Sequence, residues 1–281
     1  FGETVDAKAL SLEIPAQVYL PPCPSSFVGG DVVTGMLACG FAESGKNALL
    51  MDIGTNGEVA LGGKNRILCS STAAGPAFEG AHISCGMAGV TGAINKVGVV
   101  RGKLIIETIG GGPARGLCGS GLLSAIALFV RAGVIDETGR IADGAGRYFT
   151  EVDGQPALKI ADGITLTQKD IREVQTAKAA VSAGVKTLIH EMGIDNAQVG
   201  TLYIAGGFGN YMDADDARQI GLVPDGIALE SVGNAAAAGA ALILLDSSFM
   251  EKAGALQRAC THTELGNNPY FMDQYVDSMY F

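Results

Sequence analysis

The sequence predicts an α/β protein built on a mixed sheet with flanking helices. Two apolar, strand-like runs each end directly in a glycine turn, at residues 49–58 and 202–210. Between these runs, residues 167–192 repeat apolar side chains at helical spacing. Strands that alternate with helices and meet at glycine turns are typical of this fold class.

The first half of the chain predicts strands joined by tight turns. The expected elements are an extended, proline-rich arm at 15–24, a helix at 28–39, and strands at 48–53, 58–61 and 66–69. The Asn56-Gly57 pair is a hairpin signal between the first two strands. A second hairpin is expected over 97–109, turning at Arg101-Gly102, and an apolar helix over 119–130.

The second half contains the clearest helix. Residues 133–163 are polar and glycine-rich, which predicts turns and short strands. Thr167 and Asp170 form a Thr-x-x-Asp helix start, and the helix is expected to end near Met192-Gly193. A strand at 201–205 and a helix at 235–245 follow. Residues 270–281 hold five aromatics in twelve positions, so we expect this segment to dock on another surface.

Composition excludes several classes of protein. Charged residues make up 17% of the chain and the net charge is −10, which argues against a nucleic-acid surface. The longest apolar run, residues 235–245, is too short to cross a bilayer. The 41 glycines are roughly twice the usual share of about 7% and gather at the ends of apolar runs. We therefore expect a cytoplasmic protein with functional turns and no membrane partner.

The cysteines do not form a metal motif in the sequence. The six cysteines never come closer than 16 residues, which removes the Cys-x-x-Cys patterns of zinc and ferredoxin sites. Free thiols in a reducing compartment are the expectation.

The two glycine turns are candidate anion sites. Glycine permits tight turns whose backbone N–H groups face an anion, and strand-ending turns of this kind hold phosphates or nucleosides. Neither turn matches G-x-x-x-x-G-K-[ST] or G-x-G-x-x-G. A nucleotide would therefore be held in another way.

Seven ordered motifs carry a resemblance to a known family. They are Ser26-Phe-Val-Gly-Gly-Asp31, Asp52-Ile-Gly-Thr-Asn-Gly-Glu58, Ser71-Thr-Ala-Ala-Gly-Pro-Ala-Phe-Glu-Gly80, Ala114-Arg-Gly-Leu-Cys-Gly-Ser-Gly121, Asp170-Ile-Arg-Glu-Val-Gln175, Ala205-Gly-Gly-Phe-Gly-Asn210 and Val232-Gly-Asn-Ala235. From about Val18 to its end, the chain resembles the C-terminal domain of the reductive activators of corrinoid-dependent enzymes. That family belongs to the acetate and sugar kinase, heat-shock chaperone and actin superfamily.

The resemblance implies a fold and a function. The fold would be a ribonuclease-H-like, actin-like ATPase lobe that binds ATP with Mg²⁺. The function would be ATP-coupled reduction of a cobalt(II) corrinoid protein to cobalt(I), which serves methyl transfer. The family's iron–sulfur cluster and first phosphate loop would lie in an N-terminal region outside this chain.

This implies a domain division as well. We expect an arm at 1–26, an actin-like ATPase domain at 27–260 that is the C-terminal part of a longer protein, and an aromatic tail at 261–281.

Asp52 is the candidate catalytic residue. A strand-end carboxylate near phosphate can orient Mg²⁺ through water or polarise the attacking water. The alternative is a carboxylate that caps its own turn. Glu58 either points across the cleft or is a solvated hairpin residue.

Thirteen further residues are candidates for nucleotide binding. They are Gly54, Thr55, Asn56, Gly57, Thr72, Gly75, Glu79, Gly119, Ser120, Gly206, Gly207, Gly209 and Asn234. Ser120 and Asn234 lie at expected helix starts, where each is equally explained as a helix cap. Arg115 lies in a glycine run, from which it would reach a phosphate or the acidic surface of a partner.

Three other functions stay open. An ATP-dependent activator of 2-hydroxyacyl-CoA dehydratases would share an iron–sulfur cluster between two subunits, for which Cys118 is the candidate ligand. A small-molecule kinase of the same superfamily would need a substrate pocket with a general base, and Asp52 is the one candidate for that base in the sequence. A docking module that has lost nucleotide binding would show degraded phosphate turns. The oligomeric state, including a homodimer, is open.

Overall fold

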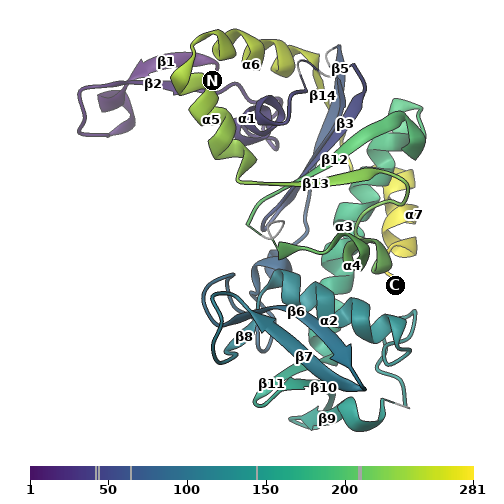
Figure 1. Cartoon of the computed structure of the whole chain (residues 1–281). Helices are drawn as coiled ribbons and strands as arrows, with labels where there is room; N and C mark the ends of the chain where they lie inside the picture. Colours follow the sequence, from purple (N-terminus) through teal and green to yellow (C-terminus); the bar gives the residue numbers. More distant parts are fainter. Residues whose placement is uncertain (42, 44, 64, 144, 208–210) are drawn as a thin grey trace.

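The computed structural model centres on one six-stranded mixed sheet (Figure 1). The structure describes residues 1–281 except 42, 44, 64, 144 and 208–210. The strand order is β13 (Ala228–Gly233), β12 (Val199–Ala205), β3 (Asn47–Ile53), β4 (Gly57–Gly63), β5 (Arg66–Thr72) and β14 (Cys260–His262). Strands β3, β4 and β5 form an antiparallel meander, whereas β12 runs parallel to both β3 and β13. The predicted α/β class and the hairpin at residues 54–57 are confirmed.

The central strand β3 is apolar on both faces because helices cover both faces of the sheet. Leu49, Met51 and Ile53 belong to one buried cluster, whereas Ala48 and Leu50 belong to a second cluster on the opposite side. A strand buried on both faces has a nearly continuous apolar sequence. Asp52 interrupts that sequence one residue before the strand ends.

Helices α3 (Gln168–Met192) and α7 (Pro269–Asp277) lie on one side of the sheet (Figure 1). Helices α1 (Gly30–Ala38), α5 (Ala235–Leu245) and α6 (Ser248–Ala259) lie on the other side. α1 and α5 touch through small residues, since a Cβ at Gly239 would lie 1.9 Å from the Thr34 carbonyl oxygen. The predicted helix at 235–245 is confirmed at both ends.

The start of α3 follows the predicted signal. The Thr167 hydroxyl accepts from the Asp170 amide, and the Asp170 carboxylate accepts from the Thr167 amide, which together form a capping box. Gly193 closes the helix in the left-handed conformation. The helix therefore has the predicted bounds.

A second body of structure is inserted between β5 and α3, in the lower part of Figure 1. One sheet has the order β7 (Lys103–Thr108), β6 (Ala93–Val100) and β8 (Gly116–Leu117), and it packs with α2 (Gly119–Arg131). The other sheet has the order β11 (Ile164–Thr167), β10 (Gln155–Ala161) and β9 (Phe149–Val152). Both the predicted hairpin and the predicted short strands are present.

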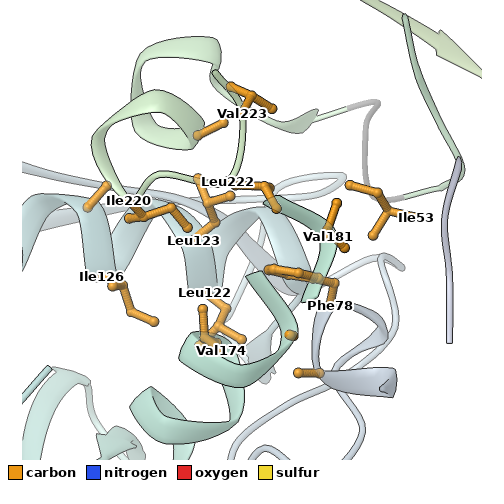
Figure 2. Packing of buried hydrophobic residues seen from close by; sticks show 14 of the residues in the cluster. Ile53, Phe78, Leu122, Leu123, Ile126, Val174, Val181, Ile220, Leu222 and Val223 are labelled. Carbon is orange, nitrogen blue, oxygen red and sulfur yellow. The ribbon is translucent and has the colours of Figure 1, made fainter. Parts of the chain in front are cut away.

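One buried cluster joins the two bodies. Figure 2 shows Ile53 at the end of β3, Phe78, Val181 of α3 and Leu122 of α2 in the same cluster. The short helices η2 (Pro76–Glu79) and α4 (Ala214–Gln219) pack against α2. The end of β3 is therefore fixed between the two bodies.

The N-terminal segment departs from the expected extended arm. β1 (Glu3–Asp6) pairs with β2 (Gln17–Leu20) in an antiparallel hairpin, which encloses the short helix η1 (Ala7–Leu10). Tyr19 of β2 packs against the cluster around α1 and α5. The proline-rich composition predicted an unpaired extended segment. It did not indicate the pairing of β1 with β2, because prolines occur both in unpaired extended segments and beside edge strands.

The C-terminal segment docks as predicted. The Tyr270 ring stacks on His190 of α3 with centroids 4.0 Å apart. The Lys186 ammonium donates to the Ser278 hydroxyl at 2.9 Å, and the Phe281 amide donates to the Glu137 carbonyl. The remaining short helices are η3 (Gly146–Tyr148) and η4 (Asn196–Gln198).

Candidate functional site

Two neighbouring parallel strands bring the two predicted glycine turns together. Asp52 of β3 is paired in register with Ala205 of β12, so the segments after both strands leave the sheet at the same edge. Gly206 has φ +93°, and a Cβ there would lie 2.7 Å from the Ile53 carbonyl oxygen and 3.2 Å from Asp52 Oδ1. Only glycine fits this contact without a shift of the backbone.

A cavity of about 390 Å³ opens at this edge. Its lining residues come from both bodies of the molecule and are Asp52, Ile53, Gly54, Phe78, Glu79, Met87, Ala88, Gly89, Cys118, Gly119, Ser120, Gly206, Gly207 and Tyr211. Seven of the predicted site residues are among them. A cavity between two bodies at the carboxyl ends of parallel strands is a common place for a ligand.

The turn after Asp52 is held to the opposite wall. The Thr55 hydroxyl donates to Glu79 Oε2 at 3.0 Å, and a Cβ at Gly54 would lie 3.4 Å from Glu79 Oε1. Gly75 has φ +73° and is the N-cap residue of η2, which begins at Pro76 and ends at Glu79. These contacts bring the predicted 71–80 segment to the rim of the cavity.

The N-terminus of α2 forms another wall. Cys118 is the N-cap residue, and its thiol donates to the Ile94 carbonyl at 3.2 Å. Ser120 is therefore inside the helix and is not its cap. The thirteen-residue helix carries partial positive charge at this end, which favours an anion.

Carboxylates surround the end of β3. Glu58 lies opposite Asp52 in the β3–β4 register and accepts from the Ser71 hydroxyl at 3.2 Å. Burial raises the pKa of Asp52, and the charge of Asp31 raises it further. Burial also raises the pKa of Glu58, although the Ser71 hydrogen bond opposes that shift. The site therefore has an excess of negative charge that a cation would relieve. Glu58 is half-buried, so the solvated-hairpin interpretation is wrong.

Several predicted residues lie away from the cavity. Asn56 and Thr72 line a second cavity of about 400 Å³, which also includes Phe27 and His262. The buried Thr72 hydroxyl donates to the Gly57 carbonyl at 3.0 Å, and a Cβ at Gly57 would lie 2.7 Å from Thr72 Oγ1. In this structure, Gly57 and Thr72 thus pack the strands together.

Asn234 caps α5, since its side chain accepts from the Ala237 amide at 2.9 Å. Gly209 lies outside the described residues. Sequence reasoning missed Met87, Ala88, Gly89 and Tyr211 as lining residues. Only Tyr211 had a signal, because it directly follows the second glycine turn.

Within the described residues, no group of three or more His, Cys, Asp or Glu side chains is arranged to hold a metal ion. All six cysteines are free, and Cys118 is 4% exposed. Of the helices described, none is long and apolar enough to cross a membrane.

Comparison with known proteins places the chain in a family. Residues 46–281 match the model described as the C-terminal domain of RACo, the ASKHA domain. The chain is 36% identical to "Corrinoid activation enzyme RamQ" of Eubacterium limosum, over 99% of the chain and 50% of that protein. It is 32% identical to "[Co(II) methylated amine-specific corrinoid protein] reductase" of Methanosarcina barkeri, over 84% of the chain and 46% of that protein.

A solved structure agrees with these matches. The "Reductive activator for corrinoid,iron-sulfur protein" superposes with a TM-score of 0.91 at 36% identity, covering 99% of this chain and 47% of that one. The chain thus spans about half the length of the relatives that it matches. The α/β fold, the mixed sheet with flanking helices and the resemblance are confirmed, and the chain belongs to the family of C-terminal ASKHA domains of corrinoid reductive activators.

Proposed function

We propose that this chain is the ATP-binding C-terminal part of a longer protein that reductively activates a corrinoid protein, coupling ATP to the reduction of cobalt(II) to cobalt(I). One observation supports this most strongly. The Asp52 turn and the Gly206-Gly207 turn meet at one cavity, beside the N-terminus of a helix. The relatives' names supply the corrinoid protein as partner.

The cavity suits a nucleotide. A Cβ at Gly207 would meet no described atom within 4 Å, so the backbone there is open to a flat group such as a nucleoside. The partial positive charge of the α2 N-terminus and the Gly54 turn would face the phosphates. We assign the contact with the phosphates to Gly54, Gly119, Ser120 and Gly206.

Asp52 suits a magnesium ion that arrives with the nucleotide. Mg²⁺ is commonly held by one or two carboxylates together with substrate phosphates and water, which requires no cage of protein ligands. Asp52 would supply one carboxylate, and Glu58 and Asp31 add negative charge around it. When bound, the ion would neutralise charge on the phosphates.

The cysteines of this chain do not suit an iron–sulfur cluster. Among the described residues, no cysteine belongs to a group of three or more His, Cys, Asp or Glu side chains that could hold a metal ion. The Cys118 thiol is buried and donates to the Ile94 carbonyl. A cluster shared between subunits needs its ligands at the surface, so the dehydratase-activator arrangement gains no support. We assign the cluster to another part of the longer protein.

Nucleotide would then act at a distance, through the arrangement of the lobes. Nucleotide favours one arrangement by its differential affinity, and that arrangement favours one state of the corrinoid partner. Coupling of this kind typically amounts to about 1–3 kcal/mol. We place the protein in the cytoplasm, with no nucleic acid as partner, consistent with its net charge of −10.

The test is corrinoid reduction by the longer protein carrying Asp52→Asn. The formation of cobalt(I) is followed by absorbance with a low-potential electron donor, with and without MgATP. We expect ATP to stimulate the wild type, and the variant to lose about 10²–10⁴-fold in ATP turnover and to lose the stimulation. Because burial and Asp31 raise the pKa of Asp52, removing its charge should not lower the melting temperature at neutral pH.

Asp162→Asn is the matched control, since that carboxylate is 99% exposed and its ion pair is with the nearby Lys159. It should behave as wild type. Unchanged turnover and stimulation in a folded Asp52→Asn protein would reduce Asp52 to a turn residue and overturn the proposal.

A further inference from the structure

The cavity at the ends of β3 and β12 divides into a phosphate part and a nucleoside part. Asp52, Gly54, Gly119, Ser120 and Gly206 form the part that we assign to Mg²⁺ and the phosphates. The other lining residues are left for the nucleoside, and they are Ile53, Phe78, Glu79, Met87, Ala88, Gly89, Cys118, Gly207 and Tyr211. The composition of this second part determines which bases the site can distinguish, an inference that rests on the proposed function.

Three described residues of the nucleoside part carry polar side chains, namely Glu79, Cys118 and Tyr211. The Thr55 hydroxyl donates to Glu79 Oε2 at 3.0 Å, so this carboxylate lies beside the phosphate turn. The Cys118 thiol donates to the Ile94 carbonyl at 3.2 Å, and the residue is 4% exposed. Tyr211, which is 49% exposed, is therefore the described residue of this part whose side chain is available to a base.

The backbone of the loop at residues 87–89 is partly bonded within the protein. The Met87 amide donates to the Leu117 carbonyl at 2.9 Å, and the Ala88 carbonyl accepts from the Val90 amide at 2.8 Å. A Cβ at Gly80 would lie 2.6 Å from the nitrogen and the oxygen of Met87, so the loop packs closely against the end of η2. Two backbone groups that could bond to the edge of a base are thus already engaged.

Contacts of this kind hold a base without reading its edge. Tyr211 offers an aromatic ring, and stacking on such a ring tolerates any base because every base has a π-face. Apolar contacts discriminate between similar ligands by only about 10–200-fold, whereas a site built on hydrogen bonds rejects the wrong ligand by about 10⁴–10⁵-fold. The nucleoside part therefore has the chemistry of weak base selection.

From these contacts we infer that the site selects the triphosphate and not the base, so that it takes purine nucleoside triphosphates as a class, GTP and ITP as well as ATP. Guanine and hypoxanthine carry a carbonyl in place of the 6-amino group of adenine, and a proton at N1. The donor and acceptor pattern of that edge is therefore reversed, which only a site without hydrogen bonds to it tolerates. CTP should bind more weakly than these three, because a pyrimidine has one ring fewer to stack.

A comparison of nucleotides tests the inference in the longer protein. Phosphate release is measured with MgATP, MgGTP and MgITP in separate reactions, and the imido analogues of ATP and GTP are titrated by calorimetry. We expect the kcat/KM values of the three nucleotides, and the dissociation constants of the two analogues, to agree within about tenfold.

Two substitutions of Tyr211 separate stacking from hydrogen bonding. Tyr211→Ala should weaken both analogues about tenfold and to the same extent, because stacking is lost for every base alike. Tyr211→Phe keeps the ring and should bind both analogues as wild type does. Tyr280→Ala is the matched control, since Tyr280 is 56% exposed and does not line this cavity. It should change neither affinity, and melting curves should show that all variants are folded.

The possible failures of this inference and of the proposed function are distinguishable. A preference for ATP over both GTP and ITP of more than about 100-fold would overturn the inference and leave the proposed function standing. A folded Tyr211→Phe protein with an altered ratio of the two affinities would also overturn it, because the hydroxyl would then read the base. A longer protein that binds none of these nucleotides would contradict the proposed function and the inference together.

Discussion

At the scale of single residues, the two glycines after β12 make different demands. A Cβ at Gly206 would press on the Ile53 carbonyl, and its φ of +93° is unfavourable for other residues. A Cβ at Gly207 would meet none of the described atoms within 4 Å, and Gly207 is one of the residues that line the cavity. One glycine is thus required by the fold, and the other leaves room for a ligand.

We therefore predict opposite results for two alanine substitutions. Gly206→Ala should lower the free energy of unfolding by about 1–3 kcal/mol. Gly207→Ala should leave stability unchanged within about 0.5 kcal/mol and weaken nucleotide binding roughly tenfold. Thermal melts and calorimetric titration of the same two proteins provide the comparison. If Gly207→Ala binds nucleotide as wild type does, the nucleotide does not lie against this backbone.

The sequence predicted those site residues whose position follows from a strand end. Asp52, Gly54, Gly206 and Gly207 each follow or end an apolar strand, and adjacent parallel strands place them together. The sequence does not indicate which side of a turn a residue faces. For that reason the sequence pattern grouped Asn56 and Thr72 with the residues of the first cavity, although both line the second cavity. Met87 and Gly89 come from a loop without a local signal.

At the scale of elements, α3 contains a lysine within its apolar face. Lys178 is fully buried, and its ammonium group donates to the Tyr280 carbonyl and lies 5.1 Å from the centre of the Phe281 ring. Burial lowers the pKa of Lys178 to about 7, and the charge of Lys186 contributes to the shift. The C-terminal segment thus covers an amine whose protonation is unfavourable in the folded protein.

This predicts a pH-dependent stability. Between pH 7 and about 10.5 the unfolded chain holds the Lys178 proton while the folded chain has released it, so the free energy of unfolding should rise with pH. The slope should be about 1 kcal/mol per pH unit, and below about pH 7 this contribution should be constant. Lys178→Met should remove the slope and stabilise the protein most at about pH 7 and below.

Chemical denaturation at several pH values measures this slope. Lys169→Met, on the exposed side of the same helix, is the control and should keep the wild-type slope. Equal slopes for wild type and Lys178→Met would mean that the buried amine keeps its ordinary pKa.

Elements held by local signals were predicted well, and those held by distant partners were not. The capping box of α3 and the positive-φ turn at Arg101-Gly102 are encoded within a few residues. By contrast, β14 is three residues long and pairs with β5, which lies far earlier in the sequence. No periodicity is visible in so short a strand.

At the scale of the whole molecule, we assign nucleotide to this chain and iron to another region. The chain purified without oxygen should therefore be colourless and hold no stoichiometric iron, since its six cysteines form no ligand group in the described residues. Iron determination and visible absorbance test this. Stoichiometric iron that is lost in Cys118→Ser would instead support a cluster shared between two subunits.

The central claim is that nucleotide binds where β3 and β12 end, and hydrogen exchange with saturating MgATP tests it most directly. Backbone amides that donate to a ligand exchange more slowly, so residues 52–55, 118–121 and 206–207 should gain protection in the protein that carries this chain. Unchanged exchange in these segments, with protection confined to residues 70–73 and 262–266 of the second cavity, would contradict this assignment.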